Sequence, residues 1–231
     1  MASYSRDEQA VVAAAEGIMR DTMARYDPSH DAYHVERVRR TALRLAHALP
    51  TPPDFLTVEL AALLHDVLDK KYVSAAQAAD PYAFFLPFFR EMADKHSVDL
   101  VSDGRARTIA RIVDNVSWTT EKKLRATGNW TDWHETCIEL HCVQDADRLD
   151  AIGAFGVLRC AAFSASTNRP LHTPPDDPAN DSSAVQHFHD KLVHIKDRLK
   201  TAPGRAMGET RHQVLLEFLA SVDEEYEGAI P

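Results

Sequence analysis

Histidine and aspartate residues that could hold a metal ion occur at three places in the chain. The pair His65-Asp66 ends a strongly apolar run, and His34 and Asp147 each lie beside an apolar stretch of their own. Burying an imidazole and a carboxylate costs several kcal/mol unless a partner neutralises them, and a divalent cation pairs with both. Neighbouring helical residues point about 100° apart, so the ion must lie beside the helix and take further ligands from elsewhere. His34 and Asp147 are candidates for those ligands.

Each of these pieces carries little information when it stands alone. An isolated His-Asp dipeptide is common, and a lone histidine such as His34 is more often a surface residue. The carboxylates Asp145, Asp147 and Asp150 would ordinarily form a solvated face or a helix cap. The joint pattern is rarer, because a histidine, a His-Asp pair and an aspartate follow one another, each set into a predicted helix. That combination favours a metal centre.

The elements that must position these side chains are helices. Apolar residues recur at intervals of three and four, which indicates amphipathic helices, and no clear alternating β-branched run predicts a strand. Residues 55–68 are apolar nearly all round, as in a central buried helix. The remaining stripes are Val35, Val38, Ala42, Leu45 and Leu49; Val185, Phe188, Leu192, Ile195 and Leu199, which predict the most regular helix of the chain; and Met207, Val214, Phe218 and Val222.

The rest of the chain extends the same pattern. Further helices are predicted over residues 7–25, 82–95, 103–116, 133–145 and 154–166. Residues 168–183 contain four prolines and are predicted to form an irregular surface loop. We find no internal repeat and no linker with a change of composition on both sides. The simplest account is a single all-α domain over residues 1–231.

The composition narrows the classes of partner. The chain has 231 residues and a formal net charge of −9, and an acidic surface repels phosphate backbones, so no nucleic acid polymer is expected as a partner. A small anionic substrate would need a local positive feature, such as a metal ion or a few lysines. No run approaches the ~20 apolar residues of a membrane span, and the charged N-terminal segment does not resemble a signal peptide. Three cysteines without close spacing favour a reducing, cytoplasmic location. The oligomeric state stays open.

Several strings in the chain resemble one known family. The order His, His-Asp, Asp on helices resembles the HD-domain metal-dependent phosphohydrolases, and the local strings resemble their small nucleotide-type subgroup between residues 27 and 222. The resemblance implies an all-α bundle with the metal site between central helices. The matching strings are His30-Asp31-x-x-His34-x-x-Arg37-Val38; Leu63-Leu64-His65-Asp66-x-x-Asp69; Val143-Gln144-Asp145-Ala146-Asp147-Arg148-Leu149-Asp150-Ala151-Ile152-Gly153; Ser182-Ser183 with His187-Phe188-x-x-Lys191-Leu192; and Gly204-Arg205, Arg211-His212 and Glu217-Phe218-Leu219.

Carried over by position, the resemblance implies one divalent metal ion with four protein ligands, His34, His65, Asp66 and Asp147. The mixed imidazole and carboxylate set suits manganese, nickel, cobalt, iron or magnesium. The chain departs from the family at one place. Related proteins often have a histidine where this chain has Val116. That departure argues against a second metal site, which would need additional histidines.

The resemblance also implies roles around the metal. Asp69 falls where related enzymes often place an acidic group that positions water. Lys71 and Lys191 are candidates for binding the substrate's phosphates, and His187 and Arg37 belong to matching strings that would contact the substrate. An aromatic cluster is interpreted as packing, with one wall of a base pocket as the alternative. Its members are Phe84, Phe85, Phe88 and Phe89.

The expected activity is metal-dependent hydrolysis of a phosphoester or phosphoanhydride. A bound divalent ion lowers the pKa of its water and withdraws charge from phosphorus. The resemblance favours a nucleoside phosphate, such as a triphosphate cut to monophosphate and pyrophosphate. Three alternatives remain. The pocket could bind a metal or nucleotide without turnover, the fold could hold two irons and oxidise a substrate with oxygen, or His65 and Asp66 could simply pair within a structural core.

Overall fold

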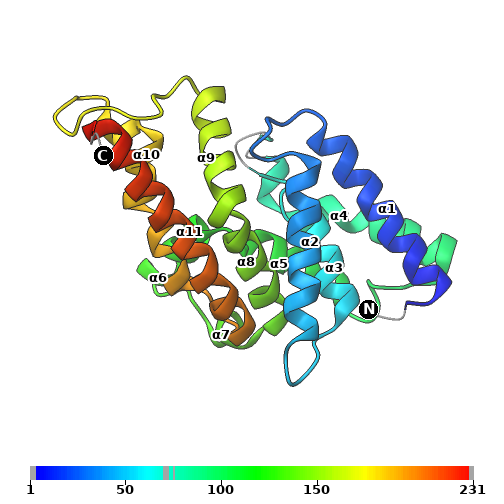
Figure 1. Cartoon of the computed structure of the whole chain (residues 1–231). Helices are drawn as coiled ribbons and strands as arrows, with labels where there is room; N and C mark the ends of the chain where they lie inside the picture. The colour runs from blue at the N-terminus through cyan, green and yellow to red at the C-terminus, as the bar shows by residue number, and fades with distance from the viewer. Residues whose placement is uncertain (1–3, 70–72, 75, 229–231) are drawn as a thin grey trace. The chain divides into compact units, whose positions relative to one another are not determined.

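The chain is described by a computed structural model that covers residues 4–69, 73, 74 and 76–228 (Figure 1). These residues form α-helices and short 3₁₀ turns, with no strand among them, so the all-α prediction is confirmed. The chain divides into two compact units. The N-terminal unit comprises Met1–Tyr26 and His30–Ala146, and the C-terminal unit comprises Asp27–Ser29 and Asp147–Pro231. The single-domain assignment stays a prediction.

Helices of the N-terminal unit surround one apolar helix, α3. This helix begins after Asp54, whose carboxylate accepts a hydrogen bond of 2.8 Å from the Thr57 amide. Every residue from Leu56 to Leu64 is buried, so burial on all sides is confirmed. The helices of this unit are α1 (Arg6–Met23), α2 (Ala32–His47), α3 (Phe55–Leu64), α4 (Pro81–His96), α5 (Arg105–Asn115), α6 (Trp118–Ala126), α7 (Asp132–Thr136) and most of α8 (Ile138–Asp150), with the 3₁₀ turn η1 (Gln77–Ala79).

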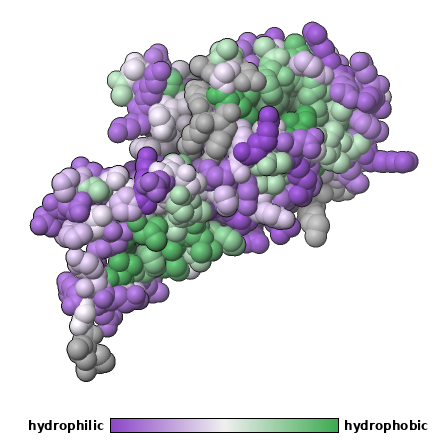
Figure 2. Space-filling model, turned by 90° about the horizontal axis from the view of Figure 1, so that it is seen from above, coloured by the Kyte–Doolittle hydropathy of each residue, from purple (hydrophilic) through white to green (hydrophobic). Residues whose placement is uncertain are grey.

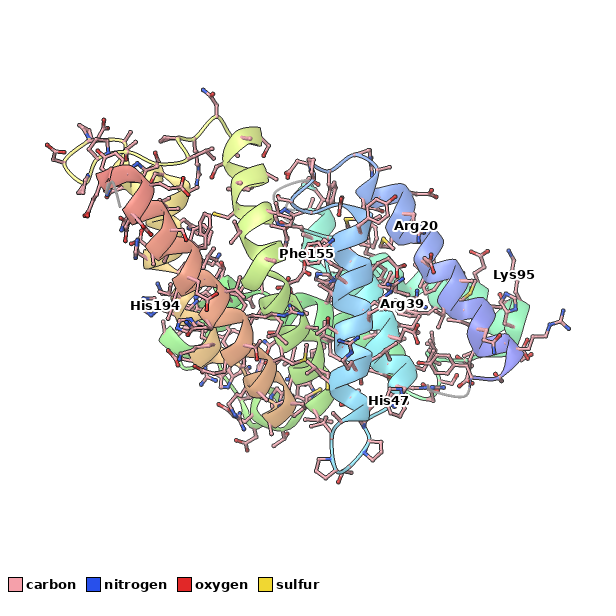
Figure 3. The ribbon with its side chains drawn as sticks, viewed as in Figure 1. Arg20, Arg39, His47, Lys95, Phe155 and His194 are labelled. Carbon is pink, nitrogen blue, oxygen red and sulfur yellow. The ribbon has the colours of Figure 1, made fainter. Side chains whose placement is uncertain are left out.

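Helix α2 lies against α3 and turns its predicted stripe inward, since Val35, Val38 and Ala42 are fully buried. A charged network also joins the two helices to α1. Arg39, labelled on α2 in Figure 3, donates to Glu59 of α3 at 2.7 Å and to Glu16 of α1 at 3.1 Å. Glu59 is only 3% exposed, and the guanidinium compensates its buried charge. Apolar packing and this network together fix α2 relative to α3.

Two predicted helices of the N-terminal unit differ from the structure. The region predicted as one helix over residues 133–145 forms two helices, α7 and α8, because Cys137 between them has an extended backbone with ψ of 97°. Helix α6 was not predicted at all. It buries only Glu121 and carries no apolar stripe, so it lacks the signal by which sequence patterns reveal a helix.

The C-terminal unit packs a long helix against a shorter one. Helix α11 (Ala202–Glu227) lies along α9 (Gly153–Ser166). Helix α11 packs closely against the preceding segment, since a Cβ at Gly208 would lie 2.2 Å from Cδ1 of Leu199 and would force that side chain to move. The remaining elements are η2 (Asn180–Ser182), α10 (Ala184–Asp190), η3 (Leu192–His194) and η4 (Lys196–Arg198), and the segment before η2 is irregular, as predicted.

The prediction of one regular helix through Val185 and Leu199 is wrong in its second half. The α-helix ends at Asp190, and two 3₁₀ turns follow where one helix through Leu199 was expected. The apolar stripe is nevertheless buried, with Phe188, Leu192 and Ile195 each at most 5% exposed. A spacing of three to four residues fits successive 3₁₀ turns as well as an α-helix, so the pattern predicted burial correctly and helix type incorrectly.

The surface carries both hydrophilic and apolar side chains. Figure 2 shows hydrophilic residues over much of the face in view, with apolar residues gathered between them. Among the described residues, no single helix is both long and apolar enough to cross a membrane; only α8 and α9 taken together, with a bend between them, satisfy the length and composition criteria. The large apolar side chains that are exposed are Tyr33, Phe84, Phe155, Leu158, Leu171, Val214, Leu216 and Tyr226.

Candidate metal centre

The ends of α2 and α3 bring three of the four predicted metal ligands together. His34 lies in the first turn of α2, where the Asp31 carboxylate caps the helix by accepting a 2.8 Å hydrogen bond from the His34 amide. His65 follows the last residue of α3, and Asp66 comes directly after it. Nε2 of His34 lies 3.3 Å from Oδ2 of Asp66, and Nε2 of His65 lies 3.4 Å from the same oxygen. The three side chains therefore converge on one point.

Burial and hydrogen bonding orient the two imidazoles. The His34 side chain is 0% exposed and the His65 side chain 1%, whereas Asp66 is 17% exposed. Nδ1 of His65 lies 2.7 Å from the carbonyl oxygen of Ala62, which can only accept a hydrogen bond. Nδ1 must therefore carry a proton, and in the neutral ring the lone pair is on Nε2, facing Asp66. A backbone partner on the outer nitrogen is common for histidines that ligate metals.

Electrostatics keep Asp66 ionised. Burial alone would raise its pKa, but His65 and His34, with a hydrogen bond from His34, outweigh burial and hold the pKa of this carboxyl well below its usual range. An ionised carboxylate beside two imidazoles is the donor set that binds divalent metals. One ligand atom from each of the three residues lies within 4.8 Å of the others, so the residues present fit a divalent ion.

Asp69 also lies in this region, with a histidine that the sequence analysis did not select. His30, Asp66 and Asp69 form a second group whose ligand atoms lie within 4.8 Å of one another. His30 precedes His34 by one helical turn's spacing in the string His30-Asp31-x-x-His34, and the two rings are 6.0 Å apart, edge to face. That spacing was the available signal, but His30 stands before the helix begins, where a side chain's direction is not fixed by periodicity.

The roles of the other predicted site residues are not tested by the structure. Arg37 lies on α2, half-buried. Lys71 lies outside the described residues. Asp147, His187 and Lys191 belong to the C-terminal unit, so their roles toward the cluster stay predictions.

Within the C-terminal unit, Lys191 and His187 influence each other. Lys191 follows the last residue of α10, and its amide donates to the His187 carbonyl. Burial lowers the pKa of His187, and the charge of Lys191 lowers it further. Asp147 is half-buried near the end of α8. By contrast Asp145 is fully buried within α8, so it does not lie on a solvated face.

Comparison with known proteins identifies the family. The model of the HD domain matches residues 31–152, which include His34, His65, Asp66 and Asp147. The chain belongs to the HD domain family. It is 30% identical over 204 residues to Bacillus subtilis YpgQ, covering 86% of this chain and 85% of that protein. It is 26% identical over 191 residues to protein L803 of Acanthamoeba polyphaga mimivirus, covering 72% of this chain and 75% of L803.

Solved structures show the same fold. An HD-superfamily hydrolase from Bacillus thuringiensis superposes with a TM-score of 0.67 at 25% identity, covering 96% of this chain and all of that one. A protein from Lactobacillus plantarum superposes with a TM-score of 0.73 at 24% identity, covering 98% of this chain and 100% of its own. Family membership and the His/Asp cluster together support a metal-dependent hydrolase as the general class.

Proposed function

We propose that this protein hydrolyses a phosphoester or phosphoanhydride bond of a small nucleotide, with a divalent ion held by His34, His65, Asp66 and Asp147. The convergence of His34, His65 and Asp66 carries the proposal, because it supplies a candidate metal site in which one carboxylate faces two oriented imidazoles. The relative YpgQ has been crystallised with ADP, and this supports a nucleotide as the substrate class.

Each residue near the proposed metal has its own role in the hydrolysis. A bound divalent ion would lower the pKa of its water and polarise the phosphoryl oxygen. Asp66 offers the anionic charge that retains the ion, and the two imidazoles bind without adding negative charge that would repel a phosphate. Asp69 lies within reach of Asp66 and can accept a proton from the attacking water. Lys191 is proposed to neutralise charge on the substrate's phosphates.

The leaving group follows from which phosphate reaches the metal. If the α-phosphate does, a nucleoside triphosphate gives monophosphate and pyrophosphate; if the terminal one does, it gives diphosphate and phosphate. We favour the first reaction on the resemblance to the small nucleotide-type phosphohydrolases.

A nucleotide panel tests both the activity and the leaving group. The purified chain is incubated with mono-, di- and triphosphates of each base and Mn²⁺, and the products are separated by ion-exchange chromatography. Turnover that is absent without metal and absent in Asp66→Ala supports the proposal. The assay is repeated with manganese, cobalt, nickel, iron and magnesium. If calorimetry detects nucleotide binding but no metal supports turnover, the protein would instead be a binding module. Hydrolysis that survives removal of the metal would overturn the mechanism.

A further inference from the structure

Two arginines on the outer face of α5 lie over aromatic rings. The guanidinium carbon of Arg107 is 4.2 Å from the centroid of the Tyr82 ring, and that of Arg111 is 3.7 Å from the centroid of the Trp133 ring. A ring attracts a cation within about 6 Å of its centroid, so both contacts are close. Tyr82 belongs to the first turn of α4 and Trp133 to α7. Neighbouring helices of the N-terminal unit therefore order both arginine side chains.

The periodicity of α5 places the two arginines together and away from the core. Arg107 and Arg111 are four residues apart, so their side chains are neighbours, with about 5–6 Å between the Cβ atoms. Both side chains are exposed. The residues on the other side of the helix are buried, and they are Ala106, Ile109, Ala110, Ile112 and Val113. The surface of α5 thus presents two guanidiniums side by side.

The acidic groups of the protein do not occupy these two guanidiniums. Over the described part of the chain, no hydrogen bond or ion pair joins the guanidinium of Arg107 or Arg111 to another residue. Arg125 on α6 differs: it also lies over a tryptophan ring, at 4.2 Å, but it donates to Glu121 at 2.9 Å and to Glu135 at 3.2 Å. In a chain with a net charge of −9, two ordered arginines without a carboxylate partner require an explanation.

A stacked guanidinium keeps its hydrogen-bond donors available. The N–H groups lie in the plane of the guanidinium and point outward along its edges, whereas the aromatic ring covers only one face. Arg125 demonstrates this, because it stacks on a ring and binds two carboxylates at once. The planar fork matches two oxygens of a phosphate or carboxylate group. Because the ring already orders the side chain, less conformational freedom is lost when an anion binds.

Acidic residues limit the length of an anion that this surface can accept. Asp103 lies just before α5 and pairs with Arg105 at 2.6 Å. Asp114 is exposed three residues after Arg111, which is on the same face of the helix. A long polyanion that followed the helix would meet one of these carboxylates and be repelled. A short anion that spans only the two guanidiniums would not.

We propose that Arg107 and Arg111 bind the diphosphate group of a small anion, with one guanidinium on each phosphate. Inorganic pyrophosphate and the phosphate tail of a nucleotide share this group. The binding residues are separate from those of the candidate metal centre, so the site does not depend on the proposed function. Water and salt screen exposed charges, and we therefore expect a dissociation constant on the order of millimolar that rises with ionic strength.

Titration followed by nuclear magnetic resonance tests the site at Trp133. The full-length chain, purified without added metal, is titrated with pyrophosphate, ADP and orthophosphate at constant ionic strength. The indole N–H signal of Trp133 is assigned by its loss in Trp133→Phe. We expect the signal to shift and saturate with pyrophosphate and to respond less to orthophosphate, which does not reach both guanidiniums. An equal response to ADP would add the nucleotide's diphosphate as a ligand, and a much weaker one would restrict the site to pyrophosphate.

Matched variants separate the two arginines from the general charge of the surface. Arg107→Gln and Arg111→Gln should each weaken pyrophosphate binding about fivefold, the upper range for one exposed charge pair. Arg107→Lys should weaken it as well, because an ammonium keeps the charge but lacks the planar fork. The control is Arg90→Gln, at an exposed arginine of α4, which should bind pyrophosphate as the wild type does. Circular dichroism checks that each variant is folded.

Three results would overturn the site. The first is a Trp133 signal that does not saturate in the tens of millimolar of pyrophosphate, and the second is unchanged affinity in both glutamine variants. The third is a response to a short poly-glutamate peptide without one to pyrophosphate, which would make the ligand an acidic protein. Orthophosphate that binds as tightly as pyrophosphate would overturn the assignment of one guanidinium to each phosphate. Because Trp133 reports binding without turnover, an inactive protein would refute only the proposed function.

Discussion

Buried charge is arranged differently in the two units of the molecule. In the N-terminal unit, His34, His65 and Asp66 bring two imidazoles and one carboxylate together, with their ligand atoms within 4.8 Å of one another. In the C-terminal unit, two arginines donate to backbone carbonyls: the buried Arg148 reaches the Arg198 oxygen at 2.7 Å, and the partly buried Arg159 reaches the Ser29 oxygen at 2.7 Å. The first arrangement offers ligand atoms to a divalent cation, whereas the second pairs each guanidinium with a backbone carbonyl.

Because of this difference, we expect substitutions in the two places to affect different properties of the protein. A change at the metal cluster should remove the ion and the activity while the metal-free fold persists. A change at the arginines should lower the free energy of unfolding whether or not metal is present, because it leaves buried polar groups poorly compensated. The predictions below test this contrast, beginning with the largest effect.

Asp66→Ala should abolish turnover. Asp66 is the only carboxylate among the three converging ligands and the only residue common to both metal groups, so no other side chain of the cluster replaces it. Metal content measured by elemental analysis should fall to near zero. The rise in melting temperature on adding Mn²⁺ should disappear as well, since the ion stabilises the native state by binding to it. Near-normal activity in this variant would remove the ligand assignment.

Arg159→Met should destabilise the metal-free protein by about 3–5 kcal/mol, the cost of removing one partner from a buried ion pair. Arg159 lies 3.4 Å from Asp150, whose side chain is 5% exposed. Urea unfolding of metal-free protein measures the loss. The matched control is Arg169→Met, at an exposed arginine of the same unit, which should change stability by no more than about 0.5 kcal/mol. Equal losses in both variants would break the contrast between the two units.

Asp147→Asn and Asp145→Asn should separate metal binding from packing. Asn at 147 is expected to empty or weaken the metal site, because it removes a predicted ligand's charge. Asn at 145 is expected to leave metal content largely intact, since Asp145 is fully buried within α8 and its loss should register in the urea midpoint instead. Calorimetric titration with Mn²⁺ gives the affinities. The reverse outcome would mean that the ligand of this helix is Asp145.

The sequence was sufficient for several features that depend on apolar periodicity. It predicted an all-α fold, the burial of α3 on every side and the inward stripe of α2. It also selected His34, His65 and Asp66, because a His-Asp pair at the end of a buried helix needs compensation. The family assignment follows from the same strings and is confirmed by the HD domain match.

Periodicity failed where polar groups or tight turns decide the structure. Helix α6 buries Glu121, which lies near Gln144 and is paired with Arg125, so its burial is polar and leaves no apolar signal. The 3₁₀ turns after Asp190 preserve the stripe that predicted a helix. His30 was overlooked because its approach to Asp66 depends on the path of a non-helical segment, which no spacing rule encodes.

Lys191→Met should reduce kcat/KM by at least about tenfold with the best nucleotide substrate while leaving metal content unchanged. A lost hydrogen bond to a charged group costs about 1.5–3 kcal/mol, and 1.4 kcal/mol corresponds to about tenfold. Methionine retains much of the side chain's apolar length. The control is Lys196→Met, since Lys196 pairs with Glu209 and is not proposed to meet substrate. An unchanged kcat/KM in Lys191→Met would show that this lysine does not bind the substrate.

The smallest effect concerns the pH dependence of stability near His187. Burial, followed by the charge of Lys191, lowers the pKa of His187 in the folded protein. The unfolded chain, with a histidine pKa of about 6.5, therefore binds more protons than the folded chain in the window just below that value. Stability is full above about pH 6.5 and falls as the pH drops through the window toward the lowered folded pKa.

Urea midpoints of metal-free protein at pH 7.5, 6.5 and 5.5 should fall most in the wild type and least in His187→Gln. Lys191→Met should lie between them, because it removes the second cause and leaves burial. His212, whose pKa is also lowered by burial, contributes equally to all three proteins and sets the slope that remains. If the urea midpoint had the same pH dependence in all three proteins, His187 would have the same pKa in the folded and unfolded states.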